Sequence, residues 1–448
     1  MTDARLFHWE YNPPPIAHEV FRVEGGTPLR GEVTISGAKN AALKLLAAAT
    51  LTGERCRFMN VPEIEDVRVM VETLRDLGVV VDHPAPNVYE VASGDVDWLF
   101  VPLEAAAKMR ASFILLGPLL ARFGQVIMSN PGGDRIGRRP VNLHVDAMRA
   151  LGAEIDYRNG YYFAKAPGRL RGAEIRFPNV TVMGTENAML AATLADGHTV
   201  IRPAALEPEV DDLIAMLQKM GAEVERTYPD TIEVRGRRRL RGANHSVIPD
   251  RIEAGTFVIA AAVSGGDVTL RGAPCDHLGA FLEVLANMGV QVACGANSIE
   301  VHGAPRGSGA YRACDVETAP YPGLATDLQP PTSVLLTQAT GTSRLYETIF
   351  EDRLEWLGEL ARMGASVEII DEHHATIVGP SRLRGTAVEI GDLRAGASLI
   401  LAALAADGIT TIRGAHHVHR GYENIEGKFI GLGARIERLA EGTVATPA

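Results

Sequence analysis

The sequence predicts an α/β protein in which six repeated units form two lobes of three. Two phrases, each with its own glycine, recur six times along the 448 residues. The downstream phrase, seen in ALGAEID and KMGAEVE, has its glycine at Gly78, Gly152, Gly221, Gly289, Gly364 and Gly433. The upstream phrase has its glycine at Gly53, Gly124, Gly197, Gly266, Gly341 and Gly408. Successive downstream glycines are 68 to 75 residues apart, a period that exceeds that of common solenoid repeats and leaves room for mixed strands and helices.

Each unit contains the same order of elements. The upstream glycine opens strand-like runs such as HTVIRPA and DVTLRGA. Between the two glycines, DDLIAMLQKMG and LEWLGELARMG carry apolar residues at helical spacing. The downstream glycine suits the C-terminal end of that helix, and a short β-branched strand follows. Four further helices are expected to be buried because they are apolar on nearly all sides: AALKLLAAATLTG, NAMLAATLADG, GTFVIAAAVSGG and ASLILAALAADG.

Six such units suit two lobes with a cleft between them, and ligand sites often lie at such interfaces. Repetition also follows from gene duplication alone, and that explanation is sufficient for the units themselves. Function must therefore be argued from particular side chains.

Composition excludes several classes of partner. The net charge of −11 argues against a protein that coats nucleic acid or an anionic membrane. An anionic ligand would need a local cluster of arginine and lysine. The four cysteines, Cys56, Cys275, Cys294 and Cys314, show no CxxC spacing, so we expect neither a zinc site nor disulfides. We likewise expect no metal and no cofactor.

The first 22 residues contain YNPPP and several charges but no apolar core, which indicates a loose extension rather than a signal peptide. No apolar run reaches the roughly 18 residues of a membrane span. We therefore expect a cytoplasmic protein. Separately, we expect a monomer or weak homo-oligomer with small-molecule partners.

Lys39 in SGAKNAAL lies near the start of an apolar helix. A cation is disfavoured there by the helix dipole, and a bound anion would offset that cost. The alternative is a solvated lysine beside an asparagine cap.

The segment NPGGDRIGRRPVN (130–142) places one acid, Asp134, among Arg135, Arg138 and Arg139. Pro140 fits the first position of the next helix. Arginine forks suit phosphate and carboxylate. The spacing alone nevertheless favours an ordinary solvated loop.

Other charged residues have two explanations each. Asp327 precedes a helix, and an N-cap is the stronger interpretation of that residue alone. Arg394 follows Asp392, a second cap candidate. Surface salt bridges would explain Arg251, Glu351, Arg353, Arg394 and Arg420. Arginine or lysine nevertheless recurs at the start of apolar helices in several units.

In order from about residue 23 to 438, the chain reads SGAKNAAL, KMRAS, PGGxxIGxRPVxLH, PDRIEAGTF, TAPxPGxxTDLQ, ETIFEDR, DLRAGASL and HRGYExIEGK. These phrases closely resemble the UDP-N-acetylglucosamine enolpyruvyl transferases. The resemblance implies an inside-out α/β barrel with chain crossovers near residues 40 and 249. The implied division is an extension at 1–22, a C-terminal lobe of 23–40 plus 249–440, and an N-terminal lobe of 41–248 with a mobile active-site loop at 130–140.

The resemblance also implies the reaction. The enolpyruvyl group of phosphoenolpyruvate would move to the 3′-hydroxyl of UDP-N-acetylglucosamine, releasing phosphate in the first committed step of peptidoglycan synthesis. Catalysis would use Asp134 as acid, Asp327 as base or hydroxyl-orienting group, and Lys39. Phosphoenolpyruvate would be bound by Lys39, Arg139, Arg353, Arg394 and Arg420. UDP-N-acetylglucosamine would meet Asn40, Arg110, Arg139, Pro140, Val141, Asn142, Leu143, Val182, Gly184, Asp327 and Ile349.

Most members of the family have a cysteine where this chain has Asp134, and a minority have aspartate. A free aspartic acid has a pKa of about 3.9, and neighbouring arginines lower it. We hypothesise that phosphoenolpyruvate neutralises those arginines and so loads a proton onto Asp134. Fosfomycin alkylates the cysteine thiolate of the family, so resistance is expected here.

Four residues depart from the family pattern at the nucleotide end: Arg138, Asn142, Met183 and His419. Met183 stands for a glycine and would be strained if that turn requires φ > 0. An enolpyruvyl transferase for another nucleotide, such as UMP, is therefore an alternative. A non-catalytic nucleotide-sugar binder is a third, but the retained acid and cations argue against it.

Overall fold

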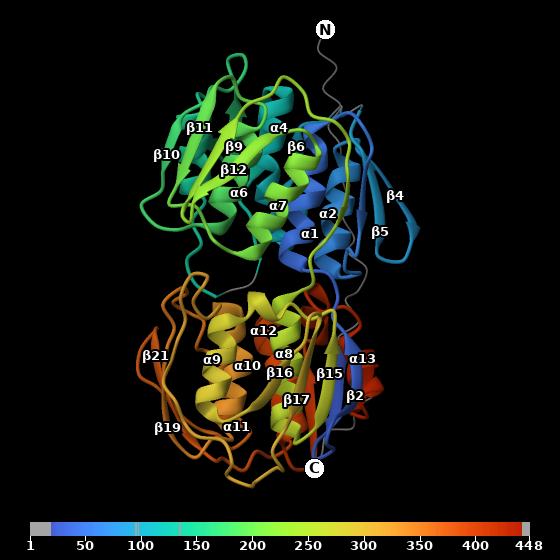
Figure 1. Cartoon of the computed structure of the whole chain (residues 1–448), viewed down its shortest axis with the longest axis vertical. Coiled ribbons are helices and arrows are strands. Elements are labelled where there is room, and N and C mark those ends of the chain that lie inside the picture. Colours follow the sequence, from blue (N-terminus) through green and yellow to red (C-terminus); the bar gives the residue numbers. More distant parts are fainter. Residues whose placement is uncertain (1–18, 95, 97, 134–135, 441–448) are drawn as a thin grey trace.

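The computed structural model of the chain describes residues 19–94, 96, 98–133 and 136–440. It has two lobes, one above the other in Figure 1. The core of the first lobe draws on residues between 38 and 247. The core of the second lobe draws on residues 21–35 and 252–436. In each lobe the helices gather in the middle and the strands lie around them (Figure 1).

The described residues form six four-stranded sheets, three in each lobe. In hydrogen-bonded order, the sheets of the first lobe are β14 (Asn244–Ser246), β3 (Cys56–Met59), β5 (Val88–Ala92) and β4 (Val80–Ala85); β6 (Phe100–Val101), β7 (Gln125–Ser129), β9 (Tyr161–Lys165) and β8 (Glu154–Arg158); and β10 (Glu174–Arg176), β11 (His198–Arg202), β13 (Thr231–Arg235) and β12 (Glu223–Tyr228). Those of the second lobe are β16 (Gln291–Cys294), β17 (Ser298–His302), β15 (Asp267–Arg271) and β2 (Arg30–Thr34); β18 (Val316–Glu317), β19 (Gly341–Tyr346), β21 (His374–Gly379) and β20 (Ser366–Ile369); and β22 (Ala387–Glu389), β23 (Ile409–Arg413), β1 (Glu19–Glu24) and β24 (Arg435–Ala440).

The helices follow the expected repeat. The α-helices of the first lobe are α1 (Lys39–Ala48), α2 (Glu65–Asp76), α3 (Leu103–Lys108), α4 (Leu116–Phe123), α5 (Asn142–Ala150), α6 (Val182–Ala192) and α7 (Pro208–Lys219). Those of the second lobe are α8 (Arg251–Ser264), α9 (Gly279–Met288), α10 (Gln329–Leu336), α11 (Leu357–Arg362), α12 (Leu393–Ala405) and α13 (Ile425–Gly431). Short 3-10 helices are η1 (Ala49–Leu51), η2 (Arg110–Leu115), η3 (Cys275–His277), η4 (Thr326–Leu328) and η5 (Ala415–Arg420).

The repeat prediction is confirmed. Five of the sheets pair a strand after an upstream glycine with a hairpin that starts after the downstream glycine, and in the sixth sheet β24 and β1 take the place of that hairpin. All six downstream glycines have φ between 85° and 99°, the left-handed conformation that ends a helix. The four helices expected to be buried are α1, α6, α8 and α12, and almost every residue in them is buried.

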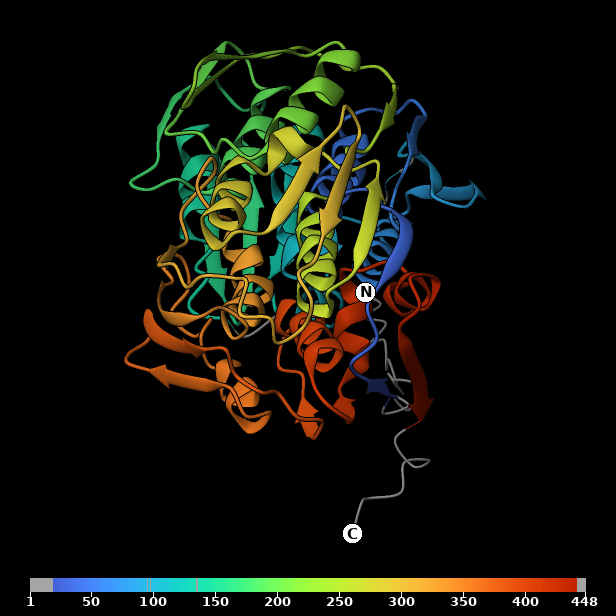
Figure 2. The same ribbon diagram turned by 60° about the horizontal axis from the view of Figure 1, so that its bottom comes forward.

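Strands from the N-terminus complete two sheets of the second lobe. β1 lies between β23 and β24, and β2 pairs with β15. In Figure 2 these blue strands lie against yellow-to-red elements. Residues 19–22 were predicted to belong to a loose extension, but they lie in β1. This strand pairs with β24 and takes the place that the second strand of the hairpin has in the other sheets.

The chain passes between the lobes twice at one place. Gly37 forms an isolated antiparallel bridge with Pro249, and the Ala38 N–H donates to the Ile248 carbonyl at 2.7 Å. A side chain at Gly37 would not fit, because a Cβ there would lie 1.7 Å from the Asn60 carbonyl oxygen. We propose that the lobe boundary lies near residues 40 and 249, supported by the two separate cores.

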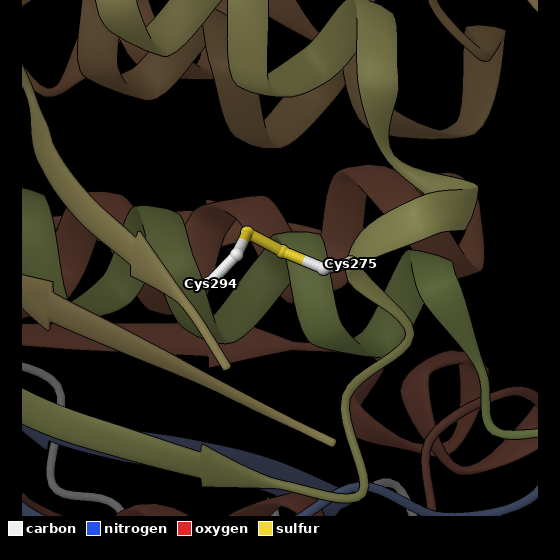
Figure 3. Close-up of a disulfide and its surroundings, with 2 residues drawn as sticks. All are labelled: Cys275 and Cys294. Carbon is white, nitrogen blue, oxygen red and sulfur yellow. A yellow bond between two sulfur atoms is a disulfide. The ribbon is translucent and has the colours of Figure 1, made fainter. Parts of the chain in front are cut away.

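One expectation about cysteine was wrong. Cys275 of η3 and Cys294, the last residue of β16, form a disulfide (Figure 3). Their Cα atoms are 6.1 Å apart, a separation that a disulfide spans. The spacing of 19 residues carries no local signature, and the pair meets because α9 returns the chain beside η3.

No helix among the described residues is both long enough and apolar enough to cross a membrane.

The repeated glycines can be tested at the last unit. Gly433 has φ 93°, and a Cβ at this position would meet nothing within 4 Å. Gly433→Ala therefore isolates the cost of left-handed backbone, and we expect it to destabilise the protein by about 1–2 kcal/mol. Gly431→Ala, in open space at the last residue of α13, is the matched control and should be neutral or slightly stabilising. Urea denaturation followed by circular dichroism measures both, and equal midpoints would contradict the interpretation.

Candidate active site

A buried carboxylate joins candidate cations from the two lobes. Lys39 is the first residue of α1, and its Nζ lies 3.2 Å from Asp66 Oδ2. Arg420, at the end of η5, donates from Nε to Asp66 Oδ1 at 3.0 Å. The Asp66 side chain is 4% exposed. Lys39 is thus buried and paired, and the alternative of a solvated lysine is wrong.

Asp66 was not among the residues predicted from the sequence. It lies in the first turn of α2, where an acidic residue is unremarkable next to the helix dipole. Its partners are 27 and 354 residues away along the chain. No local pattern could have linked them. The only available signal was general, since buried cations need a partner or a ligand.

Asp327 is the second shared carboxylate. Its Oδ1 accepts from Arg353 Nη2 at 3.1 Å, and its Oδ2 accepts from Arg394 Nε at 3.1 Å. Asp327 lies in η4, and the cap position of α10 is Leu328, so the N-cap interpretation was wrong. Burial alone would raise the pKa of Asp327, but Arg394, Arg353 and Lys39 outweigh it and hold that pKa well below its usual range.

Surrounding groups fix the two arginines. Arg394 lies at the start of α12, where Asp392 accepts the Arg394 and Ala395 N–H groups as predicted. The Arg394 guanidinium lies 5.1 Å from the centre of the Tyr422 ring. Both arginine side chains are only 2% exposed, so the surface salt-bridge explanation fails for them. The Arg353 Nε–H is buried without a hydrogen-bond partner among the described residues, which leaves a donor for an incoming anion.

The loop of the first lobe that contains Arg138 and Arg139 contacts the second lobe. The Arg138 N–H donates to Glu351 Oε2 at 3.1 Å, and the Asp352 N–H donates to the Ile136 carbonyl at 3.3 Å. The Arg139 guanidinium lies 5.6 Å from the Phe350 ring centre. Asp134 and Arg135 lie outside the described residues. Pro140 was expected at the first helical position, but α5 begins at Asn142, so Pro140 precedes the helix by two residues.

A cavity of about 450 Å³ opens beside this loop. Five of the residues predicted to meet the nucleotide sugar line it: Arg110, Arg139, Pro140, Val141 and Asn142. The rest of its wall is Asn130, Pro131, Val145, Asp146, Arg149, Tyr157 and Tyr162. Burial, together with the charge of Arg139, lowers the pKa of Arg110 to about 10. Two facing cations of this kind favour an anion between them.

The other predicted contacts do not line that cavity. Leu143 packs against the first core, and Asn40 is the second residue of α1. Ile349 donates its N–H to Glu347 at 2.9 Å, on the segment that carries Phe350. Val182 and Gly184 lie at the start of α6, where Thr181 caps the Gly184 N–H at 3.3 Å.

Met183 lies in the first turn of α6. Its backbone is helical, so the strain considered for a methionine at this turn does not arise. His419 is partly buried, with Nδ1 3.9 Å from Glu426 Oε2, and burial lowers its pKa. Among the described residues, no group of three or more His, Cys, Asp or Glu could hold a metal ion.

Comparisons with known proteins find relatives over nearly the whole chain. The family model of EPSP synthase (3-phosphoshikimate 1-carboxyvinyltransferase) matches residues 23–429. The UDP-N-acetylglucosamine 1-carboxyvinyltransferase of Paracoccus denitrificans is 47% identical over 421 residues, covering 94% of this chain and 98% of the relative. The enzyme of the same name from Solibacter usitatus is 45% identical over 419 residues, covering 94% and 99%.

Solved structures support the same fold. The enolpyruvyl transferase NikO from Streptomyces tendae superposes with a TM-score of 0.85 at 27% identity, covering 94% of this chain and 99% of NikO. An EPSP synthase from Acinetobacter baumannii, at 20% identity, has a TM-score of 0.74 and covers 94% and 100%. The fold is the inside-out α/β barrel of these enzymes. The chain therefore belongs to the enolpyruvyl transferase family, and within it to the UDP-N-acetylglucosamine 1-carboxyvinyltransferases.

Proposed function

We propose that this enzyme transfers the enolpyruvyl group of phosphoenolpyruvate to the 3′-hydroxyl of UDP-N-acetylglucosamine, releasing phosphate. The transfer is the first committed step of peptidoglycan synthesis. The observation that carries the proposal is the convergence of four buried or half-buried cations, from both lobes, on two carboxylates: Lys39, Arg353, Arg394 and Arg420 around Asp66 and Asp327. The cations exceed the carboxylates by two charges, which suits a small polyanion.

The cations divide into two groups. Lys39 and Arg420 share Asp66, while Arg353 and Arg394 share Asp327. We assign phosphoenolpyruvate, with its phosphate and its carboxylate, to the space between these groups, together with Arg139 from the loop. Preorganised donors of this kind stabilise charge that develops during transfer without needing to reorganise.

Asp327 is the proposed base or hydroxyl-orienting group. Its low pKa keeps it ionised at neutral pH, so it can accept a hydrogen bond from the acceptor hydroxyl. The same low pKa makes it a weak base in the free enzyme. An incoming anion that shares Arg353 and Arg394 would weaken their hold on the carboxylate and raise its pKa when catalysis needs it.

Asp134 is the proposed acid, on the resemblance of its segment to the family. The residues that flank it support this role. A Cβ at Gly133 would lie 3.1 Å from Arg110 Cβ, and Ile136 contacts the second lobe through Asp352. Gly133 thus lies beside Arg110 of the nucleotide cavity, and Ile136 lies beside the second lobe.

The reaction then has two balanced steps. In the addition, the sugar oxygen bonds to C2 of phosphoenolpyruvate, Asp327 takes the hydroxyl proton, and Asp134 protonates C3. In the elimination, the bond between C2 and the phosphate oxygen breaks, and C3 returns a proton to the Asp134 carboxylate as the double bond forms again. The departing phosphate takes up the proton that Asp327 accepted in the addition. The cations stabilise the negative charge of the phosphate as it leaves.

A different nucleotide acceptor is the second candidate. Asn142, where the family commonly has an acid, lines the cavity, so the group that meets the base differs in charge. We also propose a cytoplasmic location, because both substrates are cytoplasmic metabolites, and a monomer or weak homo-oligomer.

A phosphate-release assay with a panel of acceptors tests the function. With phosphoenolpyruvate present, we expect phosphate release with UDP-N-acetylglucosamine and none above background with UMP. Release with UMP alone would favour the second candidate. Tight nucleotide-sugar binding without release would favour a non-catalytic binder.

Asp327→Asn removes the ionised oxygen but keeps the shape of the side chain. We expect kcat to fall by about 10²- to 10⁴-fold, because the acceptor hydroxyl loses its proton acceptor. Phosphoenolpyruvate binding should persist, since Arg353 and Arg394 remain. Asp315→Asn, at an exposed residue of the same lobe that accepts a backbone N–H from Arg344, is the control. Unchanged kcat in Asp327→Asn would remove this residue from the mechanism.

The acid can be tested by exchange. Asp134→Cys should retain turnover and become sensitive to fosfomycin, because a thiolate attacks the epoxide far better than a carboxylate does. The wild-type enzyme should resist, without time-dependent inactivation. Mass spectrometry of the treated proteins reports the adduct. A fosfomycin adduct on wild-type Asp134 would contradict the expectation.

A further inference from the structure

The wall of the 450 Å³ cavity contains two chemically different sets of side chains. One set is Arg110 and Arg139, and the Arg139 guanidinium also lies near the Phe350 ring of the second lobe. The other set is Tyr157 and Tyr162, from the hairpin β8–β9. A pocket that offers both cations and aromatic rings suits a ligand that joins phosphates to a planar ring.

Tyr157 is unusually placed for a large aromatic residue. It is 50% exposed, yet it lines the cavity and is held in position. Its hydroxyl accepts from Asn130 Nδ2 at 2.7 Å. Its ring lies 4.7 Å from that of Tyr162, tilted by 43°. Tyr162 in turn packs edge-on against buried Phe113, with ring centroids 5.4 Å apart. The Tyr157 ring is therefore held in place at the cavity wall by Asn130 and Tyr162.

The direction of the acceptor follows from the position of the chemistry. The reacting hydroxyl must approach Asp327 and Arg353, which belong to the second lobe. Arg139, through its contact with Phe350, marks a side of the cavity that faces that lobe. In a nucleotide sugar the base lies at the opposite end from the sugar. The base is thus directed toward the tyrosines of the first lobe.

We propose that Tyr157 is a specificity-determining residue whose ring stacks on the nucleobase of the acceptor. The inference rests on the proposed function, because it takes the acceptor to be a nucleotide sugar. Asn130 supports the ring through the Tyr157 hydroxyl. An aromatic face binds any base, while polar atoms of Asn142, Asp146 and Arg149, also in the wall, can meet the edge of the base.

Calorimetric titration of UDP-N-acetylglucosamine, without phosphoenolpyruvate, tests the stacking of Tyr157 on the base in the absence of turnover. Stacking of a base on an aromatic ring contributes roughly 1–3 kcal/mol, so Tyr157→Leu should weaken binding by about tenfold or more. Tyr157→Phe keeps the ring and should bind nearly as the wild type does. Tyr228→Leu, at a 69% exposed tyrosine of hairpin β12–β13 outside the cavity wall, is the matched control.

Steady-state kinetics add a second measurement. We expect Tyr157→Leu to raise KM for the nucleotide sugar while kcat and KM for phosphoenolpyruvate stay unchanged. If the wild type binds the nucleotide sugar and Tyr157→Leu binds it equally well, stacking on Tyr157 is refuted while the proposed function stands. A tenfold loss in Tyr157→Phe as well would refute stacking. A wild-type protein that binds no UDP-N-acetylglucosamine would overturn both the acceptor assignment and the stacking on Tyr157.

Discussion

Two carboxylates, buried Asp66 and half-buried Asp327, hold together a cluster of cations that would otherwise repel each other. Lys39 and Arg420 meet at Asp66, and Arg353 and Arg394 meet at Asp327. A charge taken out of water is costly unless it is paired, so these positions constrain the helices that carry them. The start of α1, the start of α12 and η5 must all face one point between the lobes. The inside-out barrel satisfies that constraint because its helices lie in the middle of each lobe.

The same logic governs the contacts between the lobes. Arg251, at the start of α8, donates to Glu209 of α7 at 3.0 Å, and both side chains are less than 10% exposed. Asn87 of the first lobe donates to Glu423 of the second at 2.7 Å. Removing one partner of a buried ion pair leaves an uncompensated charge. Such pairs therefore fix how the lobes align, whereas the two apolar cores provide most of the favourable burial within each lobe.

An excess of positive charge also explains how weak acids and bases can serve this chemistry. In the free enzyme the arginines hold the Asp327 carboxyl in its ionised form. An anionic substrate competes for those arginines and so changes the proton affinity of the groups around it. Substrate binding and proton transfer are thereby coupled by electrostatics alone. The cavity beside Arg110 shows the same imbalance, since burial and the charge of Arg139 both lower the pKa of Arg110. An anion bound between the two arginines would oppose this effect.

The sequence by itself determined the repeat, the buried helices and the glycine at each helix end, because these depend on local periodicity and backbone conformation. It also pointed to Lys39, Asp327 and Arg394, whose surrounding phrases match those of a known family. Only the tertiary structure decided which charges meet. Asp66 pairs with a residue 354 positions away, and the Cys275–Cys294 disulfide has no local motif. The position of the Tyr157 ring depends on the packing of hairpin β8–β9 against Phe113. Spacing along the chain does not predict these contacts, because each depends on how separate parts of the chain pack in space.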